Sequence, residues 1–265
     1  MDELKTVLTS TWFDRVKKVI SCWDNRLKIG DGAFNLFRIL TDELNPKLLN
    51  RKLKKIEEIS RKQGKLKSYR KTRGELASIQ TNQILGSLFE VNIVYAALQS
   101  CPSLELFPKA GNGGSDVEAK LVISARPIYI EAKALTYSNH DIGGNNINVG
   151  CHSIGSMIKQ IQDALKEKLS KEKQLDLLSE KYPTVLFLAL GFNADQYSGT
   201  WGIESYFQQH SSNVSSVILT GSAMCREFYK VFNNNDSPFL LTQKEYDFFD
   251  NNFRSVLIEN NDNKR

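Results

Sequence analysis

One stretch of the chain, residues 113–134, has the pattern of two strands joined by a short link. After the glycine-rich segment 111–114, apolar and polar residues alternate through 117–123 and again through 128–134. A period of two residues is that of a strand with one buried face. The link 124–127 is short enough to turn the chain back on itself. The sequence therefore predicts an antiparallel hairpin.

Charged side chains gather on one face of this hairpin. The strand period sends Tyr129, Glu131 and Lys133 to one side and the intervening apolar residues to the other. Asp116 stands at the start of the neighbouring strand, so its carboxylate and that of Glu131 are close enough to hold a hard divalent cation such as Mg2+. The backbone carbonyl of Ala132 can supply a further oxygen. The alternative is a solvated hairpin whose charges merely face water.

The spacing of Asp116, fourteen residues, and then Glu131-Ala132-Lys133 resembles the PD-(D/E)xK motif of the restriction-endonuclease-like nucleases, with Ser115 in place of the proline. The resemblance implies an α/β fold with a central mixed sheet flanked by helices. It also implies that Asp116, Glu131 and the Ala132 carbonyl hold Mg2+. In that arrangement Lys133 orients the attacking water or helps to deprotonate it.

A helix is predicted at residues 79–99, just before the hairpin, from its apolar stripe. The stripe comprises Leu85, Leu88, Phe89, Ile93 and Ala96. Glu90 lies at the edge of this stripe, where burial of a carboxylate is costly unless it is paired or near a cation. Nucleases of this family often carry an acid on such a helix, so the resemblance implies that Glu90 is a third acid of the site. A glutamate at the solvent boundary is the alternative.

A second helix is predicted after the hairpin, over Ile154–Leu169. Its flank aligns Lys159, Gln162 and Lys166, which can touch a phosphate or orient the site. The alternative is that these are ordinary helix formers at a boundary. Residues 183–191 follow as a continuous apolar run, typical of a central strand. The resulting order of helix, strand, strand, helix, strand is the core arrangement that the resemblance implies.

Positive charge is concentrated between residues 47 and 73. Twelve lysines and arginines stand there against Glu57 and Glu58, whereas the whole chain has a formal net charge of only +5. Concentrated positive charge predicts a surface that neutralises nucleic-acid phosphates. The candidate contacts are Lys52, Lys55, Arg61, Lys65, Arg70 and Arg73. A solvated segment without a partner is the alternative.

The chain of 265 residues, 41% of them hydrophobic, is long enough for one large core or a core with a small appendage. We expect a mainly helical, basic N-terminal region over residues 1–78 and the nuclease core over 79–265. Other elements are expected as helices at 4–27, 33–44, 201–209 and 243–258 and as a strand at 216–220.

Several other classes of protein are disfavoured by the sequence. The four cysteines form no C-x-x-C pair, which argues against a zinc site and gives no disulfide framework. There is no G-x-S-x-G motif of a serine hydrolase, and segment 111–114 lacks the Lys-Ser/Thr of a P-loop. No apolar run approaches membrane length and no targeting sequence is evident, so a cytoplasmic location is expected.

The resemblance, together with the concentrated positive charge, implies a Mg2+-dependent endonuclease acting on double-stranded DNA, sequence-specific in the manner of type II restriction enzymes. The chain has one candidate site, and the resemblance implies that cleavage of both strands is carried out by a two-fold homodimer on a palindromic site. A repair or RNA-directed nuclease with the same core is one alternative. A non-catalytic nucleic-acid-binding module and a structural subunit of a larger assembly are the others.

Overall fold

The structure of the protein is a computed structural model. It describes residues 46–77, 81–110, 117–135, 154–169, 174–190, 196–221 and 228–257. Several predictions fall outside these ranges, namely Asp116, the helices at 4–27 and 33–44, the glycine-rich segment 111–114, and three of the four cysteines. The fourth, Cys101, is a buried free thiol.

A six-stranded mixed sheet forms the centre of the molecule, in the strand order β1-β2-β3-β4-β5-β6. The strands are β1 (Leu104–Leu106), β2 (Ala119–Ile123), β3 (Arg126–Ala134), β4 (Thr184–Ala189), β5 (Ser216–Thr220) and β6 (Tyr229–Asn233). The first three pair antiparallel, β3, β4 and β5 pair parallel, and β6 is antiparallel to β5. Strands β4 and β5 are buried throughout, as expected of parallel strands covered on both faces.

The predicted hairpin is confirmed as β2 and β3. Ile123 pairs with Arg126, so only Ser124 and Ala125 form the loop. Both adopt the left-handed conformation, with φ of 52° and 65°. A two-residue hairpin loop with two positive φ angles has the twist that the flanking strands require, although glycine or asparagine is the usual occupant.

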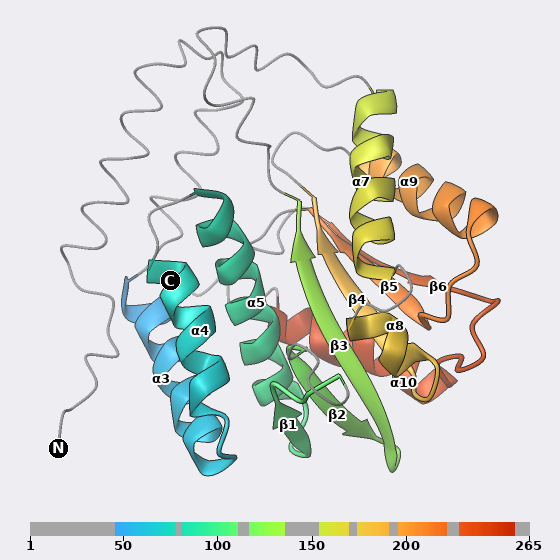
Figure 1. The fold of residues 1–265 in the computed structure, drawn as a ribbon. Helices are drawn as coiled ribbons and strands as arrows, with labels where there is room; N and C mark the ends of the chain where they lie inside the picture. Colours follow the sequence, from blue (N-terminus) through green and yellow to red (C-terminus); the bar gives the residue numbers. More distant parts are fainter. Residues whose placement is uncertain are drawn as a thin grey trace, which may run out of the picture.

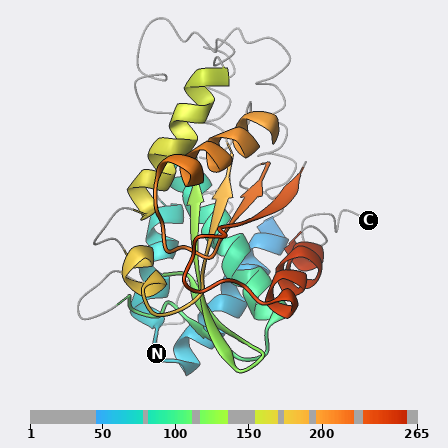
Figure 2. The same cartoon turned by 90° about the vertical axis from the view of Figure 1, so that its right-hand side faces the viewer.

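Helices cover both faces of the sheet, which gives an α/β fold (Figures 1 and 2). On one face lie α3 (Pro46–Lys62), α4 (Leu66–Ala77) and α5 (Thr81–Ser100), and on the other lie α7 (Ile154–Leu169), α8 (Gln174–Ser179) and α9 (Gln196–Gln209). Near the C-terminal end, α10 (Gln243–Asp247) continues into the π-helical turn η1 (Phe248–Phe253). Helix α7 has the bounds that the sequence predicted, and α5 agrees closely.

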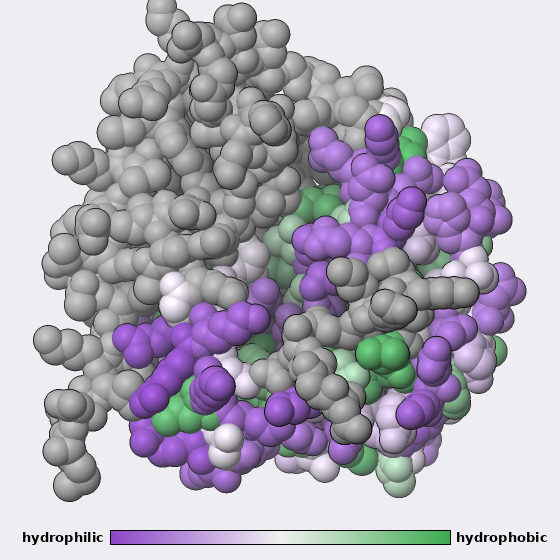
Figure 3. Space-filling view, in the orientation of Figure 1, coloured by the Kyte–Doolittle hydropathy of each residue, from purple (hydrophilic) through white to green (hydrophobic). Residues whose placement is uncertain are grey.

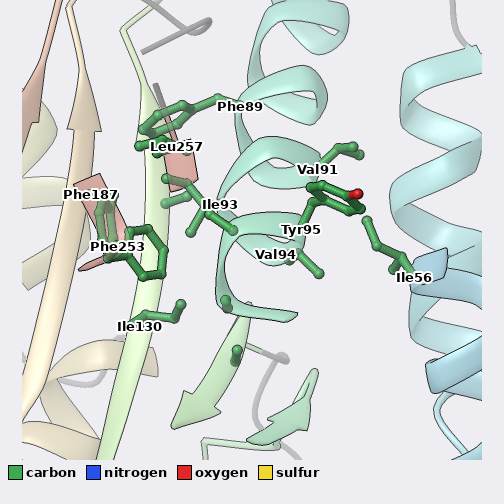
Figure 4. Close-up of a cluster of buried hydrophobic side chains, with 14 of the residues drawn as sticks. Ile56, Phe89, Val91, Ile93, Val94, Tyr95, Ile130, Phe187, Phe253 and Leu257 are labelled. Carbon is green, nitrogen blue, oxygen red and sulfur yellow. The ribbon is translucent and has the colours of Figure 1, made fainter. Parts of the chain in front are cut away.

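Helix α5 is buried on two sides and connects the sheet to α3. Figure 4 shows Phe89 and Ile93 on the side of the sheet, near Phe253, while Val91 and Tyr95 lie on the side of Ile56 of α3. A helix that is apolar around most of its circumference belongs in an interior. The boundary that the sequence predicted between an N-terminal region (1–78) and a core (79–265) falls between α4 and α5. These two helices pack directly on each other.

The opposite face has its own core under α7 and α9. It includes Ile161, Leu165, Ile203, Leu186, Leu188 and Leu219. The two helices approach closely at Gly202, where an added Cβ would lie 2.9 Å from Cγ2 of Ile161. Glycine is therefore what lets α9 pack against α7, and α7 in turn is held over β3 and β4.

Candidate active site

The candidate site lies in the part of β3 that extends beyond the end of its pairing with β2. β2 pairs only with residues 126–130, and within the described ranges no strand pairs with 131–134 on that side. In Figure 1, β1 and β2 accordingly lie beside only the lower part of β3. The N–H groups of Tyr129 and Leu135 donate toward the segment containing β4. By alternation, the N–H and the carbonyl of Ala132 point toward the β2 side.

Two glutamates face each other at this point. Continuing the register past Ala119 and Ile130 sets Glu118 opposite Glu131, and the N–H of Glu118 donates to the Ile130 carbonyl at 3.1 Å. The Ala132 N–H donates to Oε2 of Glu118 at 3.0 Å. Both glutamates are buried, with 8% and 3% of their surface exposed. Burial, followed by the charges of Glu131 and Glu90, raises the pKa of Glu118 well above its ordinary value.

Lys168 of α7 completes this cluster. Its Nζ forms an ion pair with Oε1 of Glu131. Burial lowers the pKa of Lys168, but the carboxylates of Glu131 and Glu118 outweigh that effect, so the pKa is raised. The other carboxylate oxygen of Glu131, Oε2, is buried without a hydrogen-bond partner. The ammonium group therefore satisfies only half of this buried carboxylate.

Lys133 lies on the predicted face of β3, but it pairs elsewhere. Its Nζ contacts the two carboxylate oxygens of Glu167 at 3.0 and 3.1 Å. β3 and α7 are thus joined by two ion pairs of opposite sense, Glu131 with Lys168 and Lys133 with Glu167. The lysine in contact with the buried carboxylate is the one from the helix, and the sequence interpretation did not identify it.

Glu90 approaches the same cluster from α5. It is half-buried, and its charge raises the pKa values of both Glu118 and Lys168. An acid from the helix before the hairpin therefore lies within electrostatic reach of the pair on β2 and β3. Its role in a site stays a prediction.

On α7, the three residues predicted to contact nucleic acid lie toward solvent. Lys159 and Lys166 are exposed, and Gln162 is half-buried. Figure 3 shows hydrophilic residues gathered over α7 and, across β3, over α3 and α4. The charged flank predicted for α7 is thus accessible, and its function stays a prediction.

The prediction that Lys52 contributes to a basic surface is wrong. Lys52 is only 4% exposed, its Nζ donates to Oδ1 of Asn92 at 2.8 Å, and it lies 5.6 Å from the ring centroid of Tyr95. The reason is helical periodicity, because Lys52 lies on the same side of α3 as the buried residues Leu49 and Ile56. That side packs on α5.

The other predicted basic residues lie at or near the surface, although acids neutralise several of them. Lys55 pairs with Glu58 at 3.6 Å and Arg61 with Glu57 at 2.9 Å along α3. Lys65 is half-buried and bonds to Glu105 and to the Phe107 carbonyl. Arg70 is exposed and Arg73 is half-exposed on α4. Fewer of the predicted basic residues are therefore both exposed and without an acidic neighbour than the count of charges in residues 47–73 suggested.

The residues present suit a hard cation, although only in part. Within the described ranges, no group of three or more His, Cys, Asp or Glu side chains is placed to hold a metal ion. The predicted partner Asp116 lies outside those ranges. The described residues offer oxygen ligands of the kind that Mg2+ prefers. These are Oε2 of Glu131, which has no hydrogen-bond partner, the carboxylate of Glu118, and the backbone carbonyl of Ala132.

The two overlooked residues each had a signal in the sequence. Glu118 stands two residues after Asp116, a spacing that predicts the same face of a strand, and the short link predicts that Glu118 lies opposite Glu131. Lys168 lies seven residues after Ile161 and three after Leu165, in line with the apolar stripe of its helix. A lysine in such a stripe needs a buried partner.

No protein-family model, curated protein or solved structure matches this chain. Among the helices of the described part, none has an apolar stretch long enough to cross a bilayer.

Proposed function

We propose that this chain is a Mg2+-dependent endonuclease that hydrolyses phosphodiester bonds of double-stranded DNA. The observation that carries the proposal is the Glu118–Glu131 pair, buried at the open end of β3 with one oxygen lacking a partner. Burying two carboxylates side by side costs several kcal/mol unless cations compensate them. A fold maintains such a pair most readily where its charge serves a function.

The chain's own residues divide into three roles in this proposal. Glu131, the Ala132 carbonyl and Asp116 hold the ion, while Glu118 fixes the backbone of Ala132 through its hydrogen bond. A divalent ion bound there supplies polarisation of the phosphate and a bound water of lowered pKa. Lys133 would orient the attacking water once its ammonium left Glu167, and Glu90 would add negative charge beside the ion.

The order of elements supports this interpretation. The family resemblance in residues 116–133 implies helix, strand, strand, helix, strand. The described chain contains α5, β2, β3, α7 and β4 in that sequence, with β1 inserted before β2 and α8 before β4. β4 lies parallel beside β3, so the carboxyl-terminal half of β3 is paired on one side, and on the other side no strand of the described ranges pairs with it.

The proposed substrate is a duplex because the family resemblance implies one, and basic residues that are exposed or half-exposed are available for its phosphates. Arg70 and Arg73 on α4, with Lys159 and Lys166 on α7, supply charges suited to backbone phosphates on either side of β3. We include a two-fold homodimer and sequence-specific cutting in the proposal, because one site per chain must act twice to cut both strands. A cytoplasmic location belongs to the same proposal.

Two further functions compete with this proposal on specific grounds. A repair or RNA-directed nuclease would use the same residues, since the cluster itself does not distinguish substrates. A non-catalytic nucleic-acid-binding module is favoured by the two β3–α7 ion pairs, because they engage Lys133 and one oxygen of Glu131 without a metal ion. It predicts binding that Mg2+ does not alter.

The test is to incubate wild type, Asp116→Ala and Lys133→Ala with plasmid, long linear duplex DNA and RNA, with Mg2+ or with EDTA. Discrete Mg2+-dependent DNA fragments that both variants fail to produce are expected. A smear would indicate unselective cutting, and cleavage of RNA alone would replace the DNA substrate in the proposal. Nucleic-acid binding without any cleavage would sink the nuclease and favour the binding module.

A further inference from the structure

The carboxylate pair already holds a cation that the chain itself provides. Lys168 extends from the last turn of α7 and places its ammonium on Oε1 of Glu131. The lysine side chain is 24% exposed, whereas that of Glu131 is 4% exposed. One end of this ion pair is therefore fixed in the interior, and the other belongs to a flexible side chain with access to solvent.

One ammonium does not fully satisfy this pair. It places a single positive charge beside two facing carboxyl groups and the nearby charge of Glu90, and its ion pair is with Oε1 of Glu131 and not with Oε2. A divalent cation carries twice the charge and takes several oxygen ligands at once. The geometry around Glu118 and Glu131 suits such an ion better than it suits a lysine.

An ammonium and a divalent ion cannot occupy this position together. Both would contact the same carboxylate of Glu131, and like charges a few ångströms apart repel strongly in a partly buried environment. A displaced Lys168 ammonium group has an alternative position. Lys168 lies in the last turn of α7, where the backbone carbonyls of a helix end favour positive charge. The two cations should therefore exchange rather than coexist.

We propose that Lys168 is a resident counter-ion of the Glu118–Glu131 pair, that a divalent cation displaces it, and that the lysine thereby sets the cation affinity of the site. The inference rests on the proposed function for the identity of the ion, but it concerns binding and needs no nucleic acid. Lys168 stabilises the two carboxylates when no ion is bound. It weakens binding because every ion that enters must first break the Lys168–Glu131 pair.

The first test measures the dissociation constant of Mn2+, with Mg2+ as competitor, for wild type and Lys168→Met. Removing the competing ammonium should tighten binding by about tenfold or more, which corresponds to about 1.4 kcal/mol. Lys166→Met is the matched control, because it removes the same charge from an exposed position two residues away. Lys168→Arg keeps the charge and should bind Mn2+ about as weakly as wild type. Equal affinities of Lys168→Met and Lys166→Met would overturn the proposal.

The second test uses wild type and does not depend on a variant that folds. An acylating reagent labels accessible lysines, and mass spectrometry reports the labelling of each one. Displacement predicts that Mg2+ or Mn2+ increases labelling of Lys168 while Lys166 stays unchanged. Constant or decreased labelling of Lys168 at saturating ion would contradict the exchange.

The two proposals can fail separately. If Mn2+ binds and exchanges with Lys168 but no nucleic acid is cut, the nuclease proposal fails and the counter-ion proposal stands. If neither wild type nor Lys168→Met binds Mn2+, the counter-ion proposal fails, whatever a cleavage assay with Mg2+ shows.

Discussion

The two faces of β3 contrast within a single strand. Toward α5, Ile128, Ile130 and Ala132 join a dry core that continues into the aromatic residues Phe187 and Phe253. Toward α7, the alternate residues of the same strand are an aromatic, an acid and a base, and two of them form ion pairs with that helix. One face is built for packing, and the other carries the charge.

The contrast teaches where this fold tolerates buried charge. Glu131 is as deeply buried as many core residues, yet it lies beyond the last residue with which β2 pairs. A lysine from α7 reaches it there, and Glu118 reaches back to the backbone of Ala132. Among the described residues, the buried charge lies where β2 no longer pairs with β3 and where the backbone N–H of Ala132 has a side chain as its partner.

The largest expected effect comes from a substitution in the apolar core between the sheet and α5. Phe187→Ala removes a fully buried ring that stacks 4.9 Å from Phe253 and contacts Phe249 at 6.1 Å, measured between centroids. The resulting cavity should lower the free energy of unfolding by about 3–5 kcal/mol, as measured by urea denaturation. Mn2+ affinity of the folded protein should not change, because the ring points away from Glu131. A change in affinity would show that the two faces are coupled.

The next largest effect concerns the packing of α9 against α7, the helix that pairs with the charged residues of β3. Gly202→Ala would place a Cβ 2.9 Å from Cγ2 of Ile161, which is fully buried and has little room to move. We expect a loss of about 1–3 kcal/mol in the free energy of unfolding. Gly74→Ala is the matched control, since it lies in helix α4 with no atom within 4 Å of the new Cβ. That change should stabilise by about 1 kcal/mol, so equal effects of the two would refute the packing argument.

A smaller effect tests one of the buried polar atoms without a hydrogen-bond partner, the Tyr69 hydroxyl of helix α4. The Tyr69 hydroxyl is buried without a hydrogen-bond partner, so Tyr69→Phe should raise the free energy of unfolding by about 1 kcal/mol. Burial, with a contribution from the Glu57 charge, raises the pKa of Tyr69 from 10.0 to about 12. The unfolded state therefore loses its proton first, and wild-type stability should fall as pH rises from 10 to 12.

Measurement of thermal unfolding across this pH range checks the sign. Tyr69→Phe removes this residue's share of the alkaline loss, so the gap between variant and wild type should widen above pH 10. A gap that narrows with rising pH would mean that Tyr69 loses its proton more readily in the folded protein than in the unfolded chain, which would contradict the raised pKa.

The smallest effect lies at the turn that joins the two strands of the site. Ala125 adopts φ of 65°, a conformation that disfavours a side chain. Ala125→Gly should stabilise the protein by about 0.5–1 kcal/mol. The measurement is urea denaturation, and Ala119→Gly, within β2, should destabilise by contrast.

Periodicity predicted the elements that carry strong patterns and missed those that depend on neighbours. Helix α7 and the hairpin follow directly from apolar spacing. Strands β1 and β6 and helix α8 were not predicted, since each is short and two of them are edge strands defined by pairing with one neighbour. The helix predicted at 243–258 is real, but η1 interrupts its α-helical geometry.

The candidate site was predictable where its residues are close in sequence. Spacing placed Glu131 and Lys133 on one face of a strand, and the structure agrees. It could not show that Lys133 would pair with α7 while Lys168 took its place at Glu131, because that depends on how far α7 reaches along β3. Lys52 shows the converse, since a count of charges does not reveal which side of a helix is buried.

The most direct test of the central claim compares two isosteric changes across the same interface. Glu131→Gln and Glu167→Gln each remove one ion pair between β3 and α7, but only the first removes a buried carboxylate from the proposed ion site. The measurement is the rate of cleavage of supercoiled plasmid in Mg2+ and in EDTA. We predict Mg2+-dependent cleavage by wild type, most of that activity in Glu167→Gln, and a loss of about a hundredfold or more in Glu131→Gln. Cleavage by Glu131→Gln at the wild-type rate, or by wild type in EDTA, would contradict the account.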